Sequence, residues 1–414
     1  MRRRNFLATA LASTAGLLTV PWAMRRALAD ASGSDTRFIF IVNRGGWDPL
    51  QTLAPVFEGS AITPPPGTTR AVVGGIPFSD AATRPAVRAF FEQWSSRTLL
   101  VHGLSVRSVA HDVCERTMLT GAATGEVTDH ATRLAVGLPA AALPHLVVSG
   151  PVFPGPYSAV ATRLGQTGQL AGLIDGSALA RSDQPVMPLP TPAGDLVDRL
   201  LDRRTRAFVD AGPASRVDWE TANARANTLV DLRRDLRLVT DGSFESQISL
   251  SVDVLAKGLS RCVTITPPLA WDTHVDSDNQ QNALWQVFFV GLQALVAALA
   301  ARSAPEGDGK SLLDKTIVVA LSEMARTPGL NADAGRDHWP WTSAMLIGGG
   351  LSGGRALGGY DSGYRGLGID PADGTVAATL PAPTPADLGA TLLSLAGLDP
   401  ALMGPGTAPI GGVR

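Results

Sequence analysis

Acidic and imidazole side chains follow one apolar run of this sequence at a short distance. The β-branched run at 316–321 stops at Glu323, and Asp337 and His338 stand next to each other further along. In open α/β sheets, ligands bind in the crevice beyond the carboxyl ends of the strands. This stretch therefore predicts an acid and imidazole site at the end of a strand.

Three more apolar runs lead to residues of the same types. Asp272 and His274 lie two positions apart, so on an extended segment they point to the same side. Asp48 and His111 also follow apolar runs. Mixed carboxylate and imidazole sets suit zinc, manganese or iron, whereas all-oxygen sets favour calcium or magnesium. The pattern predicts a divalent metal site, with zinc or manganese preferred.

Each of these residues also has an ordinary structural interpretation. An Asp after Gly-Gly, such as Asp48, most often forms a turn, and Asp–His pairs also occur at surfaces. However, four strand ends of one α/β pattern carry acidic or imidazole residues, and this recurrence favours a functional site. Of the remaining histidines, His102 is interpreted as a core residue, His130 as the start of a helix and His145 as the start of a strand. The tryptophans near the candidate ligands suit either a sugar ring or the core: Trp47, Trp271, Trp339 and Trp341.

Strand-like runs alternate with segments of helical spacing. β-Branched runs bounded by turn residues are typical of buried strands in parallel sheets. The alternation predicts an α/β fold with a mainly parallel central sheet flanked by helices. The predicted strands span 37–42, 97–103, 145–150, 261–266, 316–321 and 344–350; the predicted helices span 84–95, 215–238, 244–259, 283–301 and 384–397; residues 64–75 are expected to form a loop.

The predicted helix at 283–301 is long and apolar enough to be considered as a membrane span. Gln286 and Gln293 interrupt it, and the sequence has no second segment of this kind after the N-terminus. A crossover helix buried in the fold is the preferred interpretation.

The N-terminus has the pattern of a twin-arginine signal. Arg3-Arg4 is followed by Asn5 and the Phe6-Leu7 pair, then by an apolar stretch and Ala27-Leu28-Ala29 as a cleavage site. We expect residues 1–29 to be a signal peptide read by the twin-arginine export machinery, which places the protein in the periplasm or outside the cell. Permanent anchoring is the alternative. Residues 30–414 are expected to form a single domain, with an insertion or cap around 151–245.

Charge and cysteine content exclude several classes of protein. Without the first 29 residues and their five arginines, 30 basic side chains face 37 acidic ones. A net acidic chain argues against nucleic-acid binding, which depends on phosphate neutralisation. The two cysteines, Cys114 and Cys262, form no metal or haem motif, and the sequence leaves open whether they pair.

Several of these motifs together resemble a known family. In order along the chain they lie at 45–48, 271–274, 322–328, 335–338 and 348–350. The chain resembles DUF1501, a family of twin-arginine-exported bacterial proteins within the alkaline phosphatase and sulfatase superfamily. The resemblance implies an alkaline-phosphatase-like α/β fold and a two-metal site.

The resemblance also implies roles for single residues. Asp48 resembles the acid on the metal nearest the nucleophile, and Asp272 with His274 resembles the pair on the other metal. Glu323 ends the strand that carries Asp-His in phosphatases, but Met324 replaces that histidine. His338 resembles the later histidine of the second site. Asp337 is expected either to replace the missing ligand or to hold His338 by a hydrogen bond.

The nucleophile position departs from the superfamily pattern. Counting back nine residues from Thr120-Gly121 reaches His111, where these enzymes have Ser, Thr or Cys, and Arg116 follows it. The resemblance therefore implies a metal-dependent hydrolase of phosphate or sulfate esters, with His111 as nucleophile or acid, Arg116 beside it, and a small-molecule or saccharide ester as substrate. The alternative is a non-catalytic exported protein that binds a partner on the same scaffold.

Overall fold

The computed structural model describes residues 34–125, 127–138, 141–158, 160–165 and 240–414, with isolated positions at 170, 196, 199, 200, 203 and 238 between them. The signal peptide expected at 1–29 lies outside the described residues. So do most of the insertion expected around 151–245 and nearly all of the helix expected at 215–238. These three expectations stay predictions.

Eight strands form the central sheet, in the order β12-β4-β11-β8-β1-β7-β5-β6. All neighbouring pairs are parallel except the two that β11 makes, with β4 and with β8. The predicted α/β fold with a mainly parallel sheet is confirmed. The strands are β1 (Arg37–Asn43), β4 (Thr98–Ser105), β5 (His145–Val147), β6 (Ala161–Arg163), β7 (Cys262–Ile265), β8 (Thr316–Ser322), β11 (Trp341–Gly348) and β12 (Arg355–Leu357).

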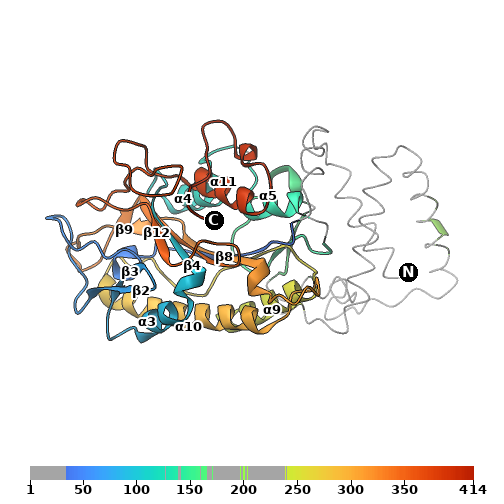
Figure 1. Cartoon of the computed structure of the whole chain (residues 1–414), viewed down its shortest axis with the longest axis horizontal. Helices are drawn as coiled ribbons and strands as arrows, with labels where there is room; N and C mark the ends of the chain where they lie inside the picture. The colour runs from blue at the N-terminus through green and yellow to red at the C-terminus, as the bar shows by residue number, and fades with distance from the viewer. Residues whose placement is uncertain are drawn as a thin grey trace, which may run out of the picture.

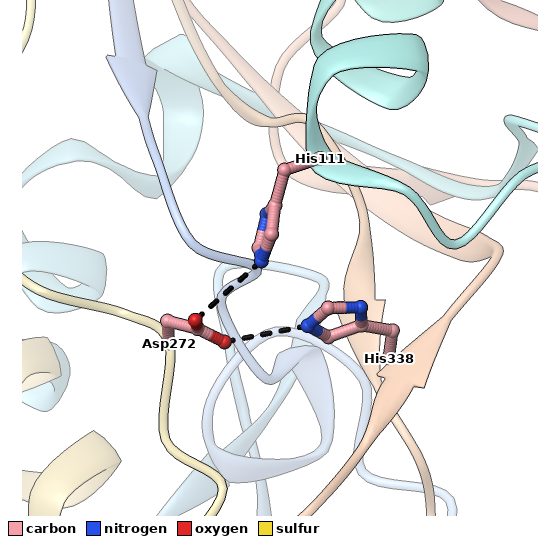
Figure 2. A group of neighbouring side chains, drawn as sticks. All are labelled: His111, Asp272 and His338. Atoms are coloured by element: carbon pink, nitrogen blue, oxygen red, sulfur yellow. Dashed lines mark hydrogen bonds and ion pairs between the residues drawn. The ribbon is translucent and has the colours of Figure 1, made fainter.

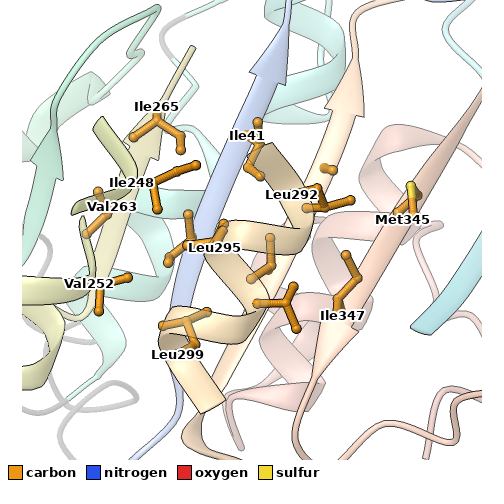
Figure 3. Packing of buried hydrophobic residues seen from close by; sticks show 14 of the residues in the cluster. Ile41, Ile248, Val252, Val263, Ile265, Leu292, Leu295, Leu299, Met345 and Ile347 are labelled. Carbon is orange, nitrogen blue, oxygen red and sulfur yellow. The ribbon is translucent and has the colours of Figure 1, made fainter. Parts of the chain in front are cut away.

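The central strand β1 contributes side chains to both faces of the sheet. Ile39 and Ile41 belong to one apolar layer, whereas Phe38, Phe40 and Val42 belong to the other. This follows from the two-residue period of a strand, and it explains why the run is apolar without interruption. Figure 3 shows the first layer, where the leucines of one long helix lie across β1 and its neighbours.

Helices cover both faces (Figure 1). On the face of Ile39 lie α3 (Pro85–Trp94), α9 (Phe244–Ala256) and α10 (Ser277–Ala301), and on the opposite face lie α4 (His111–Thr120), α5 (His130–Gly137) and α11 (Pro385–Leu395). Trp47 and Trp271 are fully buried beside Trp285 of α10, with ring centroids 4.9 Å from it in both cases. These two tryptophans are therefore core residues and do not form the wall of a binding site.

Helix α10 connects β7 to β8 as the expected crossover, and it begins earlier than expected, at Ser277. Among the described residues it is the one helix that is long and apolar enough, by composition, to cross a membrane. Its inner face packs on the sheet through residues such as Leu292 and Leu295, as Figure 3 shows.

Some elements differ from the sequence expectation. The loop expected at 64–75 contains β2 (Thr69–Val73), which forms a hairpin with β3 (Ile76–Asp80). Gly74 and Gly75 both have positive φ, which is the backbone that a two-residue hairpin turn requires. Helix α4 was not expected because its sequence is largely polar. Cys114 and Cys262 are both buried and free, so they do not form a disulfide.

Candidate metal centre

Two loops meet at the carboxyl end of β1 because of close backbone contacts. A Cβ at Gly45, whose φ is +112°, would lie 2.6 Å from the backbone nitrogen of Asp272. A Cβ at Gly335 would lie 1.8 Å from the carbonyl oxygen of His274. Glycine is thus required at both positions. The contacts bring the segment of Asp272 and His274 between the β1 loop and the loop that leads to His338.

Three side-chain atoms from these loops form a small triangle. The Nε2 atoms of His274 and His338 lie 3.0 Å apart, and Asp272 Oδ1 lies 3.0 Å from the first and 3.3 Å from the second. His111 Nε2 lies 3.5 Å from the other carboxylate oxygen of Asp272. Figure 2 shows His111 and His338 pointing at Asp272 from two sides. We call these four side chains, His111, Asp272, His274 and His338, the imidazole cluster.

Each histidine of the imidazole cluster has an acceptor at its other ring nitrogen. Nδ1 of His111 donates to Glu323 Oε1 at 2.9 Å, and Nδ1 of His274 donates to Asp337 Oδ1 at 3.0 Å. Nδ1 of His338 donates to the carbonyl oxygen of Val109 at 2.7 Å. Carboxylates and carbonyls only accept, so in the neutral rings Nε2 carries the lone pair. All three lone pairs therefore face the Asp272 carboxylate.

This arrangement fits a divalent metal ion. Ligand atoms held about 2.1 Å from one ion lie about 3.0 Å apart at octahedral angles and about 3.4 Å apart at tetrahedral angles. The sides of the triangle fall within this range. Ligating histidines commonly donate their second N–H to a carboxylate or a carbonyl, as all three do here. The ligand atoms of His111, Asp272 and His338 lie within 4.8 Å of one another, so the described residues include a group able to hold a metal.

Arg326 holds the Asp272 carboxylate in place. Its guanidinium is fully buried and donates to Asp272 Oδ1, to the carbonyls of Gly45 and Gly46, and to the carbonyl of Arg336. Partial burial would raise the pKa of Asp272, but the hydrogen bond and charge of Arg326 outweigh it and lower the pKa to about 2. The carboxylate is therefore ionised at any ordinary pH. Arg326 was not predicted as a site residue, although it lies in the motif at 322–328.

Glu323 orients His111. Its carboxylate is buried and accepts from the backbone N–H of Gly45 at 2.7 Å and from the Ser322 hydroxyl at 3.0 Å, besides the His111 ring. The hydrogen bond from His111 to Glu323 raises the pKa of the imidazole. Glu323 was expected as a metal ligand, but its carboxylate bonds to the outer nitrogen of His111 and so lies behind the imidazole cluster.

The remaining candidates take other places. Asp48 is fully buried, caps the short helix after β1 through the Leu50 N–H, and pairs with Arg336 at 3.3 Å. Burial raises the pKa of Asp48 to about 6 although Arg336 opposes the shift. Arg116 donates to the carbonyl of Gly125. The structure brings neither Asp48 nor Arg116 into the imidazole cluster.

Asp337 and Met324 also differ from their expected roles. The Asp337 carboxylate accepts from His274 and from Asn331, so the histidine that it holds is His274, not His338. The difference arises because His338 turns its Nδ1 toward Val109. Met324 is fully buried in the apolar layer, so the imidazole that phosphatases carry there has no counterpart at this position. Instead His111, from α4, adds the third imidazole.

A polar groove of about 870 Å³ opens along the carboxyl ends of β5 and β6. Arg44 lines it and pairs with Glu115 at 2.5 Å, and Glu115 lies one helical turn after His111 on α4. Arg163 and Asp241 line it as well. The groove therefore contains charges of both signs, and Glu115 in its wall belongs to the helix that carries His111.

Comparison with protein families identifies part of the chain. Residues 241–411 match the DUF1501 family model. The family is described as a protein of unknown function. The resemblance inferred from the motifs is confirmed over this region. The DUF1501 region includes Asp272, His274, Glu323 and His338, whereas His111 lies outside it.

The solved structures that are similar to this chain include these three. A protein in the alkaline phosphatase superfamily from Vibrio parahaemolyticus has a TM-score of 0.36 and 10% identity, over 89% of this chain and 67% of that one. A candidate sulfatase from Bacteroides thetaiotaomicron has a TM-score of 0.41 and 11% identity, over 91% of this chain and 74% of that one. A protein solved with its substrate D-glucosamine-2-N,6-O-disulfate has a TM-score of 0.35 and 10% identity, over 92% of this chain and 82% of that one. No curated protein matches the chain.

Proposed function

We propose that this protein is exported and is a metal-dependent hydrolase of phosphate or sulfate esters. The observation that carries the proposal is the convergence of three Nε2 lone pairs on one ionised carboxylate, with every Nδ1–H satisfied behind them. Three lone pairs facing a carboxylate repel one another unless a cation or protons lie between them. A divalent ion is the partner that this donor set suits best.

His274, His338 and Asp272 Oδ1 would hold the ion. An ion bound there would supply Lewis acidity at an ester oxygen and a more acidic water. Arg326 keeps Asp272 ionised and directed at the ion, and Asp337 keeps His274 in the required tautomer. These contacts fix the ligands before the ion binds, which reduces the reorganisation that binding requires.

His111 would act as the general acid. Its Nε2 faces the second oxygen of Asp272, and its Nδ1 is held by the buried Glu323, so the ring is oriented toward the same point as the metal ligands. The hydrogen bond to Glu323 raises the pKa of His111 and so favours the protonated ring, which can give its Nε2 proton to the leaving-group oxygen as the ester bond breaks. A thiol nucleophile is disfavoured, because Cys114 is buried in the apolar layer and burial raises the pKa of its thiol to about 11.

The polar groove would receive the rest of the substrate. Arg44 and Arg163 offer guanidinium groups that suit phosphate or sulfate oxygens. The acidic Glu115 and Asp241 and the backbone groups of the groove suit hydroxyl groups, so a saccharide ester is a reasonable substrate class.

The test is turnover of 4-nitrophenyl phosphate and 4-nitrophenyl sulfate by protein loaded with zinc or manganese. We expect activity in the wild type, loss of both metal and activity in Asp272→Asn, and unchanged behaviour in the exposed control Asp333→Asn. His111→Asn is expected to keep the metal and to lose about 10²- to 10⁴-fold in kcat. Loss of metal in His111→Asn would make His111 a ligand instead. Absence of turnover with every metal would favour the non-catalytic binding protein.

A further inference from the structure

A second cavity, of about 310 Å³, lies apart from the imidazole cluster. It is formed by the residues after β4 together with the C-terminal segments around α11. This volume is at the lower end of the range found for small-molecule sites. No part of the proposed hydrolase function uses it.

The walls of this cavity are mostly apolar and stiff. Aliphatic side chains and prolines make up most of the lining: Ile369, Pro371, Leu380, Pro381, Ala382, Pro383, Pro409 and Ile410. Proline fixes φ, so such walls change little when a ligand binds. Leu380 is 41% exposed, which is unusual for a large apolar side chain next to a buried core. The lining is suited to an apolar chain or ring.

Two polar side chains in the cavity are already satisfied. The Asp387 carboxylate accepts from the N–H and hydroxyl of Thr384 at 2.9 and 2.7 Å and from the N–H of Ala408 at 3.1 Å. The Thr384 hydroxyl in turn accepts from the Asp387 N–H. This capping box satisfies backbone N–H groups at the start of α11. The negative charge of Asp387 is therefore directed at the N-terminus of the helix.

Arg107 is the exception. Within the part of the chain that the structure describes, its guanidinium has no hydrogen-bond or ion-pair partner, and its side chain is exposed at the cavity. Its backbone is left-handed, with φ of +61°, a conformation that is strained for a non-glycine residue. The neighbouring backbone is held by hydrogen bonds from Ser105 to Pro383 and from Val106 to Pro340. The fold therefore holds the backbone of Arg107 at the wall of an apolar cavity, and its exposed guanidinium has no partner among the described residues.

We propose that this cavity binds a small carboxylic acid with an apolar chain or ring. The carboxylate would pair with Arg107, since a guanidinium forms two parallel hydrogen bonds with that group, and the apolar part would lie among the prolines. The site is connected to the imidazole cluster along the chain. Arg107 precedes Val109, whose carbonyl holds His338, and His111 itself.

The experiment is isothermal titration calorimetry of the full chain with 4-phenylbutyrate, with the neutral 4-phenylbutan-1-ol and with acetate. We expect 4-phenylbutyrate to bind at least tenfold more tightly than either of the other two. Arg107→Gln should weaken binding at least tenfold, whereas Arg70→Gln, at an exposed arginine on β2, should leave it unchanged. Ala382→Phe should abolish binding by filling the cavity.

Asp272→Asn separates this site from the metal centre, because a carboxylate can also bind a metal ion. Binding of 4-phenylbutyrate should persist in Asp272→Asn, and it should do so whether or not the chain hydrolyses esters. Equal binding of the acid and the alcohol would overturn the proposal. So would equal binding by Arg107→Gln and wild type, or loss of binding in Asp272→Asn.

Discussion

The Nε2 atoms of His274 and His338 lie 3.0 Å apart, although both Nδ1 atoms are committed as donors. Both Nε2 lone pairs therefore point into the same small space, where they repel each other unless a cation lies between them. The pair suits one ion that both rings ligate, so the pH should control how tightly that ion binds.

Zinc should bind more weakly at pH 5 than at pH 7, because an imidazole needs a free lone pair on Nε2 to ligate the ion. Titration calorimetry at the two pH values measures the two affinities. His338→Ala should lose the metal at both. Equal zinc affinity at pH 5 and pH 7 would show that the imidazoles are not ligands.

Removing the carboxylate that accepts a hydrogen bond from His274 should weaken metal binding, although no metal ligand is removed. Asp337→Ala is expected to lower metal affinity about 10- to 100-fold, because His274 loses the acceptor that fixes its tautomer. Asp337→Asn should recover part of the loss, since an amide oxygen can still accept from Nδ1. Competition with a chromogenic chelator gives the affinities. Equal affinities for the alanine variant and the wild type would contradict the orienting role.

Replacing Arg326 should destabilise the fold as well as the site. Arg326→Met leaves the carbonyls of Gly45, Gly46 and Arg336 without their donor, and we expect the free energy of unfolding to fall by about 3 kcal/mol. Urea unfolding of the metal-free protein measures this change. Arg88→Met is the matched control, because Arg88 pairs with Asp80 at an exposed position. If both variants lose a similar, small amount of unfolding free energy, Arg326 does not stabilise the fold in the way proposed.

Acid should destabilise the protein partly through His102. Burial lowers the pKa of His102 to about 4, below the value of an unfolded histidine, so the unfolded chain binds more protons between about pH 6.5 and 4. The stability that the neutral ring contributes is present above pH 6.5 and is lost as the pH falls. From pH 7 to pH 5 the loss should be about 2 kcal/mol.

His102→Gln tests this sign and size. The glutamine can still bond to Ser343, which contacts His102 Nδ1 at 2.9 Å, but it does not titrate. Urea unfolding in the presence of a chelator should show a smaller difference between pH 7 and pH 5 in the variant than in the wild type. Identical differences would mean that His102 already binds its proton in the folded state.

The sequence predicted the sheet better than it predicted the helices. The apolar runs that became β1, β7 and β8 are buried on both faces, and such runs carry an unmistakable pattern. The direction of β11 was not predictable, because an apolar run reads the same in a parallel and an antiparallel strand. Helix α4 was missed because its exposed half is polar and its buried half is short.

For the site, the ligand types and their strand ends were predictable, and their grouping was not. Asp272 and His274 meet because of their spacing, but His338 reaches them only through the close approach at Gly335. The partner of each Nδ1 depends on ring orientation, which no spacing encodes. Arg326 has a sequence signal in retrospect, because it is a cation four residues after a fully buried strand. Its acceptors on Gly45 and Gly46 lie far away along the chain and could not be predicted.

The place of β1 in the sheet has a consequence for the DUF1501 region. β7 and β8 both lie within residues 241–411, yet they are not hydrogen-bonded to each other, because β1 lies between them. A fragment limited to that region would therefore contain two open strand edges at its centre, each of which could pair with another molecule. The matched region thus omits the strand that joins β7 to β8 in the sheet, and a fragment designed to fold alone should include β1 from Arg37 onward.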